Sequence, residues 1–314
     1  MTILVTSPFN PQHWVSELQK HFPDRSIATM EEPFDRRSVH YVVSWHHPEG
    51  SLAGLPNLSA IISLGAGVDH IFRDPRLPPD ALVIRIVNHN LTDRMSEYVV
   101  LHCLIRLRKM AFVTECQQAK KWVFDPTLPS AADVRVGLMG FGVLGQDAGQ
   151  KLKMMGFDVA AWVRAPRPSE DIPFFAGFDE LDAFLQRTDI LVCLLPLTEE
   201  TRGILNYGLL EKLAQDGRLG GPFLINCGRG GCQVEADILA ALDNGILKGA
   251  TLDVFETEPL PKDSPLWDHP DVTITPHNSA LSNSTHVSNQ IVKIIHQLEA
   301  GEIPEGVVNP ERGY

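Results

Sequence analysis

A strand-like segment that runs directly into a glycine-rich turn restricts the fold of this 314-residue chain more than any other feature. Residues 134–145 read VRVGLMGFGVLG, and a helix-like stretch follows as far as Met155. The three glycines, Gly140, Gly142 and Gly145, suit a tight turn, a close approach of the backbone to a pyrophosphate, and close helix–strand packing. Because a strand precedes this G-x-G-x-x-G pattern and a helix follows it, the pattern predicts a doubly wound parallel sheet that binds a dinucleotide.

Short apolar runs alternate with helix-like stretches along most of the chain, which is typical of α/β proteins with mainly parallel sheets. The expected strands of the first hundred residues are Ile3–Thr6, Ile27–Met30, Tyr41–Trp45, Ala60–Leu64 and Val83–Val87. A second series comprises Val134–Met139, Val159–Val163, Ile190–Leu195, Phe223–Asn226, Ala250–Val254 and Val272–Thr275. The six strands of this second series match the number in a dinucleotide-binding fold.

The length suits two domains rather than one ordinary core. A long helical pattern without proline or glycine runs from Asp93 to about Lys120 and separates the two series of strands. After a turn in which Ser282, Asn283 or Ser284 could form the cap, a final amphipathic helix is expected to return to the first domain. We therefore expect a discontinuous first domain, 1–98 plus 283–314, a second domain at 99–282, and an active site in the cleft between them.

Composition excludes several classes of function. The net charge of −12 argues against nucleic acid as a partner, because phosphate binding needs a basic surface. No segment approaches the roughly 20 apolar residues of a membrane span, and the N-terminus carries no secretory pattern. The five cysteines are odd in number and form no C-x-x-C pair, so they predict neither a disulfide framework nor a metal site. The cytoplasm is the expected compartment.

Three polar residues close three successive apolar segments near the end of the chain. These are Arg229 in INCGRGG, Glu258 in DVFETEP and His277 in TITPHNSA. Side chains at the carboxyl ends of parallel strands converge on one edge of a sheet. A cation, a carboxylate and an imidazole placed there suit acid–base chemistry on a small anion.

The next strand after the glycine turn ends in an arginine where NAD-selective proteins usually carry an acidic residue. Arg164 occupies this position, and Arg167 follows closely. Guanidinium groups can bind a 2′-phosphate with paired hydrogen bonds. The sequence therefore predicts NADPH as the preferred cofactor, with NADH less favoured.

Long ordered motifs support a family resemblance that covers nearly the whole chain. GFGVLG, LLPLTEETRGILN, INCGRGG, DVFETEPLP and PLWDHPDVTITPH resemble the D-isomer-specific 2-hydroxyacid dehydrogenases. SLGAGVDH at 63–70, the arginines after the second strand and the closing ERGY are most similar to the glyoxylate/hydroxypyruvate reductase A branch. The resemblance implies two doubly wound domains, Rossmann-like in the dinucleotide domain and flavodoxin-like in the other, and a homodimer.

The resemblance also assigns roles to the three polar residues. It implies that Arg229 binds and polarises a 2-oxo acid, that Glu258 rather than Glu256 orients the histidine, and that His277 donates and accepts the proton. Histidine suits this task because its proton affinity lies near neutral pH. The implied cofactor contacts, beyond the glycines and arginines, are Val143, Leu144, Leu195, Pro196, Cys227 and Asp253, with Asp253 expected to bind the nicotinamide carboxamide.

A glycine-rich turn in the first domain resembles the family's substrate-carboxylate loop. Backbone N–H groups of Ala66, Gly67 and Val68 can hold a carboxylate without a side chain, and Trp45 is expected to line the substrate pocket. Asn278 and Ser279 depart from the small or aliphatic residues that usually follow the histidine.

The sequence leaves three functions open. The first is an NADPH-preferring reductase of glyoxylate or hydroxypyruvate, which the resemblance favours. The second is a dehydrogenase of the same fold for another D-2-hydroxy acid, formate or phosphite. The third is a non-catalytic dinucleotide sensor, which the presence of all three polar residues disfavours.

Overall fold

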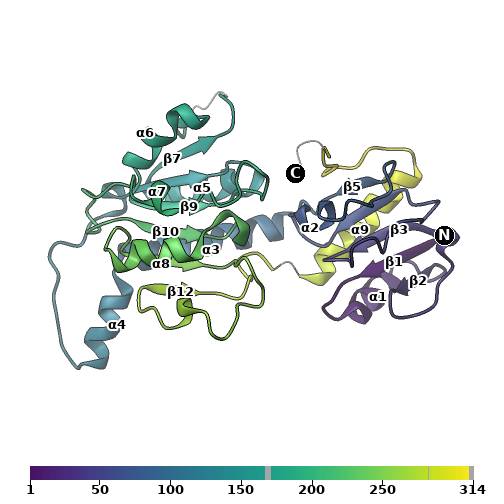
Figure 1. Ribbon diagram of the computed structural model, residues 1–314, viewed down its shortest axis with the longest axis horizontal. Helices are drawn as coiled ribbons and strands as arrows, with labels where there is room; N and C mark the ends of the chain where they lie inside the picture. The colour runs from purple at the N-terminus through teal and green to yellow at the C-terminus, as the bar shows by residue number, and fades with distance from the viewer. Residues whose placement is uncertain (167–170, 282, 311–314) are drawn as a thin grey trace. The chain divides into compact units, whose positions relative to one another are not determined.

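The computed structural model describes residues 1–166, 171–281 and 283–310, and it divides the chain into two compact units (Figure 1). One unit comprises Met1–Leu91 with Ser282–Tyr314, and the other comprises Thr92–Leu281. Each unit is built on one parallel sheet, so the predicted class of two doubly wound α/β domains is confirmed.

The first unit holds a five-stranded sheet in the order β2-β1-β3-β4-β5. Its elements are β1 (Thr2–Thr6), α1 (Pro11–Gln19), β2 (Ser26–Thr29), η1 (Arg36–Ser38), β3 (Val39–Ser44), β4 (Ala60–Ser63), α2 (Asp69–Phe72), β5 (Leu82–Ile84) and α9 (Ser284–Glu299). All five expected strands are present. The Asn283 side chain accepts a hydrogen bond from the Thr285 N–H and so caps α9, which belongs to this unit.

Both faces of the first sheet are covered, as the continuous apolar strands require. On one face, Ile3, Val5 and Ile84 pack with the apolar side of α9, including Ile291 and Ile295. On the other face, a second apolar cluster forms around Leu4, Val42 and Ile61 (and further residues up to Val308). The last helix is therefore part of the core of the unit that contains the N-terminus.

The second unit holds a seven-stranded sheet in the order β12-β11-β10-β9-β6-β7-β8. The strands are β6 (Arg135–Met139), β7 (Asp158–Val163), β8 (Phe174–Ala176), β9 (Ile190–Cys193), β10 (Phe223–Asn226), β11 (Gly249–Leu252) and β12 (Val272–Ile274). The helical connections are α3 (His89–Leu107), α4 (Met110–Gln118), η2 (Ala131–Asp133), α5 (Val143–Met154), η3 (Phe178–Glu180), α6 (Leu181–Gln186), α7 (Tyr207–Leu210), η4 (Gly230–Cys232), α8 (Glu235–Asp243) and η5 (Pro265–Trp267). The chain reverses its direction across the sheet between β6 and β9, and ligands of open α/β sheets bind at such a switch point.

Two expectations about the strands and helices of this unit need correction. A seventh strand, β8, pairs with β7 at the edge of the sheet. It was missed because its three residues are only half-buried and give no continuous apolar run. The expected helix from Asp93 to Lys120 is broken, since Lys109 takes a left-handed conformation (φ 49°) that ends α3 and starts α4 in a new direction.

The expected domain boundary at residue 98 also differs from the division of the structure at Leu91. Met95 and Tyr98 lie before the expected boundary, but both pack into the apolar cluster around Val136 and Leu138 of β6. Their side chains therefore belong to the core of the second unit.

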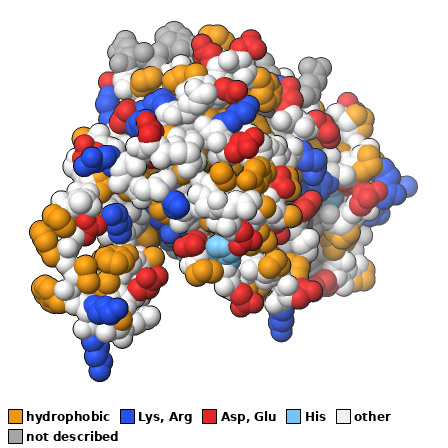
Figure 2. Space-filling model, turned by 60° about the vertical axis from the view of Figure 1, so that its left-hand side comes forward, with side chains coloured by type: hydrophobic (Ala, Val, Ile, Leu, Met, Phe, Trp, Pro, Cys, Tyr) orange, Lys and Arg blue, Asp and Glu red, His pale blue; other side chains and the backbone are white. Residues whose placement is uncertain are grey.

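A segment of the second unit projects away from its sheet and carries α4 (Figures 1 and 2). Figure 2 shows hydrophobic side chains gathered on this projection. The large apolar residues exposed on α4 and just after it are Met110, Phe112, Val113, Trp122, Val123 and Phe124. Among the helices of the described ranges, none is long and apolar enough to cross a membrane.

Candidate active site

The three polar residues of the candidate site follow three neighbouring strands. Arg229 follows β10, Glu258 lies in the loop after β11, and His277 comes just after β12. These strands are parallel and adjacent in the order β10-β11-β12, so their carboxyl ends meet at one edge of the sheet. The structure thus places all three residues at that edge, where the sequence predicted them.

The closest pair of this site joins the imidazole of His277 to the carboxylate of Glu258. His277 Nδ1 lies 2.7 Å from Glu258 Oε2, and the other carboxylate oxygen accepts a hydrogen bond from the Phe255 N–H at 2.9 Å. Both side chains are about one-third exposed, so the pair is reachable from solvent. The side chain that meets His277 is that of Glu258, the residue that the spacing favoured over Glu256.

The ionisation of Glu258 settles which nitrogen of the imidazole carries a hydrogen towards it. Burial alone would raise the pKa of Glu258, but the hydrogen bonds from His277 and from the Phe255 N–H hold that pKa below its ordinary value. An ionised carboxylate only accepts hydrogen bonds, so His277 Nδ1–H is the donor. This leaves His277 Nε2 as the atom that can exchange a proton with a ligand.

A buried amide positions the loop that carries Arg229. The Asn226 side chain donates to the Arg229 carbonyl at 3.2 Å and to Gln233 Oε1 at 2.8 Å, while its own carbonyl accepts from the Gly228 N–H. Arg229 itself donates from Nη1 to the Gly228 carbonyl at 2.8 Å. The sequence interpretation missed Asn226 and Gln233, although a polar residue that closes an apolar strand needs buried partners and could have been noticed.

Gly230 ties the arginine loop to the loop of Glu258. A Cβ at Gly230 would lie 1.9 Å from the carbonyl carbon of Phe255, so only glycine permits this contact. The backbones of the two loops are packed against each other, which explains why the second glycine-rich motif needs glycine at this position.

The main chain at His277 adopts a left-handed conformation, with φ of 51°. Its N–H donates to the Asp253 carbonyl at 2.8 Å, and the next two N–H groups, of Asn278 and Ser279, donate to the Asp253 carboxylate. Asp253 is fully buried. Its contact with a nicotinamide carboxamide stays a prediction, whereas its contacts with the histidine loop are present in the structure.

The predicted cofactor loop connects β6 to α5 at the centre of the sheet. Gly140 has φ of 95°, and a Cβ at Gly145 would lie 2.2 Å from the Gly140 carbonyl oxygen, so the fold itself requires both glycines. A Cβ at Gly142 would meet no protein atom within 4 Å. Gly142 is also the N-cap of α5 and offers no side-chain cap to the first N–H groups of the helix. This open, uncapped helix start fits a pyrophosphate.

The other predicted cofactor contacts surround this loop. Val143 and Leu144 form the first turn of α5, and Leu195 and Pro196 follow β9, the neighbour of β6. Cys227 follows β10 and is buried. At the end of β7, Arg164 Nη2 lies 3.3 Å from Glu200 Oε2, and both side chains are more than half exposed. Arg167 lies outside the described residues.

The predicted substrate residues of the first unit also lie together. Trp45 follows β3, and its ring packs against Gly65, where a Cβ would lie 2.8 Å from the ring. Ser63 Oγ donates to the Gly67 carbonyl and accepts from the Gly65 N–H, which shapes the turn that continues through Ala66 and Val68. The structure therefore joins Trp45 to the predicted carboxylate loop within one unit.

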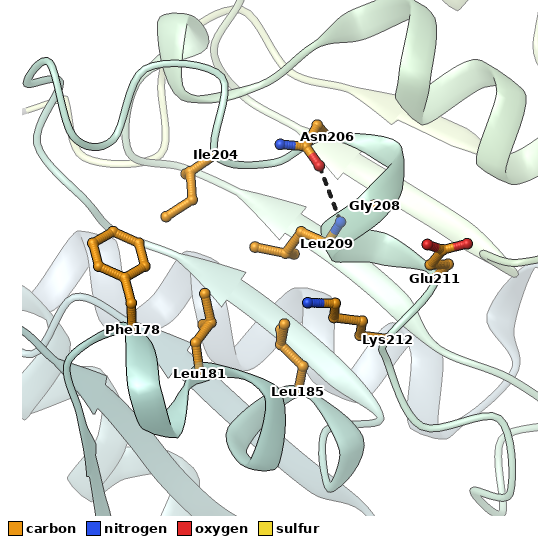
Figure 3. Close-up of a pocket in the computed structure, with 9 residues that line it drawn as sticks. All are labelled: Phe178, Leu181, Leu185, Ile204, Asn206, Gly208, Leu209, Glu211 and Lys212. Carbon is orange, nitrogen blue, oxygen red and sulfur yellow. Dashed lines mark hydrogen bonds between the residues drawn. The ribbon is translucent and has the colours of Figure 1, made fainter.

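A hollow elsewhere in the second unit is separate from this site (Figure 3). Figure 3 shows Phe178, Leu181 and Leu185 facing Leu209 across it, with the Asn206 side chain capping α7. None of the predicted site residues lines this hollow. No cluster of metal-binding side chains occurs among the described residues either.

The sequence profile of the D-isomer specific 2-hydroxyacid dehydrogenase NAD binding domain matches residues 100–279. The chain belongs to the D-isomer specific 2-hydroxyacid dehydrogenase family. Glyoxylate/hydroxypyruvate reductase A of Serratia proteamaculans is 38% identical to it, and the match covers 100% of both chains. The resemblance to this family, and to its reductase A branch, is confirmed, and the predicted NAD(P)-dependent oxidoreductase with it.

Two solved members of the family share 43% identity with this chain and superpose with a TM-score of 0.93. Each match covers 100% of this chain and 99% of the other. One is a probable 2-hydroxyacid dehydrogenase of Rhizobium etli in complex with NADP, HEPES and L(+)-tartaric acid. The other is an NADPH-dependent glyoxylate/hydroxypyruvate reductase of Sinorhizobium meliloti in complex with NADP and sulfate.

Proposed function

We propose that this 2-hydroxyacid dehydrogenase is an NADPH-preferring reductase that converts glyoxylate to glycolate and hydroxypyruvate to D-glycerate. The observation that carries the proposal is the 2.7 Å contact between His277 Nδ1 and Glu258 at the sheet edge that also holds Arg229. The full-length similarity to glyoxylate/hydroxypyruvate reductase A supports the choice of substrate.

The geometry suits the addition of a hydride and a proton across a ketone or aldehyde. Bound NADPH would supply the hydride for the carbonyl carbon. His277 Nε2–H then donates its proton to the carbonyl oxygen, while the carboxylate of Glu258 holds Nδ1–H and stabilises the charged imidazole. The guanidinium of Arg229 binds the oxygen atoms of the 2-oxo acid and stabilises charge on the carbonyl oxygen.

The preference for NADPH rests on the end of β7. Arg164 stands there in place of the usual acidic residue, and its guanidinium can bind the 2′-phosphate, with Arg167 as a second cation. The solved relatives from Rhizobium etli and Sinorhizobium meliloti bind NADP.

The substrate carboxylate is assigned to the glycine-rich turn of the first unit. The backbone N–H groups of Ala66, Gly67 and Val68 would donate hydrogen bonds to this carboxylate, and Ser63 already shapes the turn through its hydrogen bond to the Gly67 carbonyl. The ring of Trp45 packs against Gly65 of this turn, and we expect it to limit the size of the acid.

A panel of acids tests the proposal. The purified protein is mixed with glyoxylate, hydroxypyruvate or a bulkier 2-oxo acid and with NADPH or NADH, and the loss of cofactor absorbance is followed. We expect turnover with the two small acids and NADPH. Turnover only with formate or phosphite in the oxidising direction, or no turnover at all, would contradict it.

Two variants with a matched control test the site. Replacing His277 by Ala should lower kcat by about 10²- to 10⁴-fold while NADPH still binds. Replacing Glu258 by Gln should also lower kcat, whereas replacing nearby Glu256 by Gln should not. Equal effects of the two glutamate variants would remove Glu258 from its role.

A homodimer is the proposed assembly, with the projection of α4 as the contact surface. Contiguous exposed apolar side chains mark interaction surfaces, and Phe112, Trp122 and Phe124 lie close together in the sequence on this projection. A sedimenting mass of one 34.8 kDa chain would refute the dimer. Dissociation of the dimer by Trp122→Glu would support it.

The cytoplasm is the proposed compartment. All five cysteines are free, which suits a reducing environment. Recovery of the protein in the periplasmic or membrane fraction of the source cells would argue against it.

A further inference from the structure

We infer that Asp253, Thr275 and Tyr98 are positioning residues that hold the main chain of His277 in the conformation needed for proton transfer. The inference rests on the proposed role of His277. It adds a hydrogen-bonded chain that reaches from the core helix α3 to the loop of the general acid.

The carboxylate of Asp253 is the centre of this series of hydrogen bonds. Its Oδ1 accepts from Thr275 Oγ1 at 2.6 Å and from the Asn278 N–H at 3.0 Å, and its Oδ2 accepts from the Ser279 N–H at 3.1 Å. The side chain is fully buried. A buried carboxylate is stable only when such donors surround it, so these three contacts must be kept together.

The chemistry of the hydroxyl groups fixes which atom donates in each of these hydrogen bonds. Thr275 has one hydroxyl hydrogen, and it donates this hydrogen to the Asp253 carboxylate. The second contact of Thr275 Oγ1, at 2.8 Å to Tyr98 Oη, must then be one in which Tyr98 donates. Burial raises the pKa of Tyr98, so its hydroxyl keeps the hydrogen that it donates.

Tyr98 anchors the chain in the rigid part of the second unit. It lies on α3, and its ring packs in the apolar cluster that includes Val99, Val136 and Cys227. The order of donation is therefore Tyr98 to Thr275 to Asp253, and from Asp253 the contacts pass to the backbone of the loop. Tyr98, which is packed in the hydrophobic core, thereby restrains the loop that carries His277.

The restraint acts on both sides of His277. The His277 N–H is bound to the Asp253 carbonyl, and the two following N–H groups are bound to the Asp253 carboxylate. Between them, His277 has φ of 51°, a conformation that side-chain-bearing residues rarely adopt without support. Loosening the Asp253 carboxylate would let this residue relax and move its imidazole away from Glu258.

Replacing Thr275 by Val tests the inference, because valine keeps the shape of threonine and removes the hydroxyl. The rate of NADPH oxidation in a single turnover should fall by about 10- to 100-fold, as expected for a misplaced catalytic group. The dissociation constant of NADPH should stay within about twofold. Thr275→Ser, which restores the hydroxyl, should recover most of the rate, and Tyr98→Phe should lose part of it.

Thr273, which lies in β12 two residues before Thr275, provides a matched control. Its hydroxyl accepts a hydrogen bond from Arg106 of α3 at 3.3 Å and makes the same kind of contact between α3 and β12. Thr273→Val should leave the single-turnover rate unchanged. An equal loss in both valine variants would show a general loosening and overturn the inference.

The remaining outcomes also decide the question. An unchanged rate in Thr275→Val and Tyr98→Phe would refute the positioning role, as would failure of Thr275→Ser to recover the rate. Wild-type activity in His277→Ala would instead refute the proposed function, so the two failures are distinguishable. If Thr275→Val does not fold, Tyr98→Phe, which keeps the packed ring, carries the test with Thr275→Ser.

Discussion

Replacing His102 by Gln should flatten the dependence of stability on pH in the second unit. His102 lies on α3, is 5% exposed, and stacks on the ring of Tyr98 with 4.3 Å between ring centroids. Burial and, to a smaller extent, the positive charge of Arg106 lower its pKa to about 4, although the charge of Asp253 partly opposes the shift. The folded protein therefore keeps this imidazole neutral at pH values where the unfolded chain binds a proton.

The folded and unfolded pKa values of His102 set the sign and the size of this pH dependence of stability. Above about pH 7.5 both states are neutral at His102, and the residue contributes nothing to the pH dependence. As the pH falls below 6.5 the unfolded chain takes up a proton that the folded protein refuses, so stability is lost. With a folded pKa of about 4, the loss is about 2 kcal/mol at about pH 5 and about 3 kcal/mol below about pH 4.

Urea unfolding followed by circular dichroism at several pH values measures this loss. The difference in free energy of unfolding between wild type and His102→Gln should change by about 2 kcal/mol from about pH 7.5 to about pH 5. Leu101→Gln, a neighbour on the exposed side of the same helix, should run parallel to wild type. A parallel curve for His102→Gln as well would refute the burial of a neutral imidazole.

Two further predictions concern the cofactor. Gly142→Ala should leave the melting temperature unchanged, because its Cβ meets no protein atom, but it should weaken NADPH binding at least about tenfold. Gly145→Ala should destabilise the protein by about 2 kcal/mol, because its Cβ would approach the Gly140 carbonyl. Calorimetry and cofactor titration separate the two effects, and loss of stability in Gly142→Ala would contradict the assignment. Glu200→Gln should raise the ratio of kcat/KM with NADPH to that with NADH by about two- to fivefold, since it frees Arg164 from an exposed ion pair. Arg164→Asp should lower the same ratio, and no change in either variant would argue against a 2′-phosphate contact at Arg164.

The sequence predicted well those features that depend on neighbouring residues. The five strands of the first sheet and six of the seven in the second are continuous apolar runs, and the glycine turn at Gly140–Gly145 has its context within twenty residues. The three residues Arg229, Glu258 and His277 each follow such a run, so their common sheet edge could be inferred. The break at Lys109 could not, because no proline or glycine marks it.

Contacts between distant segments could not be predicted from the sequence. Tyr98 and Thr275 are 177 positions apart, and nothing local in either segment indicates that their hydroxyl groups meet. Asp253 was predicted as a cofactor contact because it ends a strand, but its hydrogen bonds to Asn278 and Ser279 depend on the register of β11 and β12. The same two residues looked like departures from the family, although only their N–H groups are used in these contacts.

The distribution of the five cysteines makes the rates of thiol alkylation a measure of how often the second unit opens. Cys103, Cys193, Cys227 and Cys232 are buried, and Cys116 alone, on the α4 projection, is partly exposed. Burial raises the pKa of the Cys103 and Cys227 thiols, and the contact with Cys232 together with burial raises the pKa of Cys193, so these groups react slowly with alkylating reagents. One thiol should therefore titrate at once in the native enzyme and the others only as fast as the second unit opens, and protection of Cys116 would report a partner covering the projection.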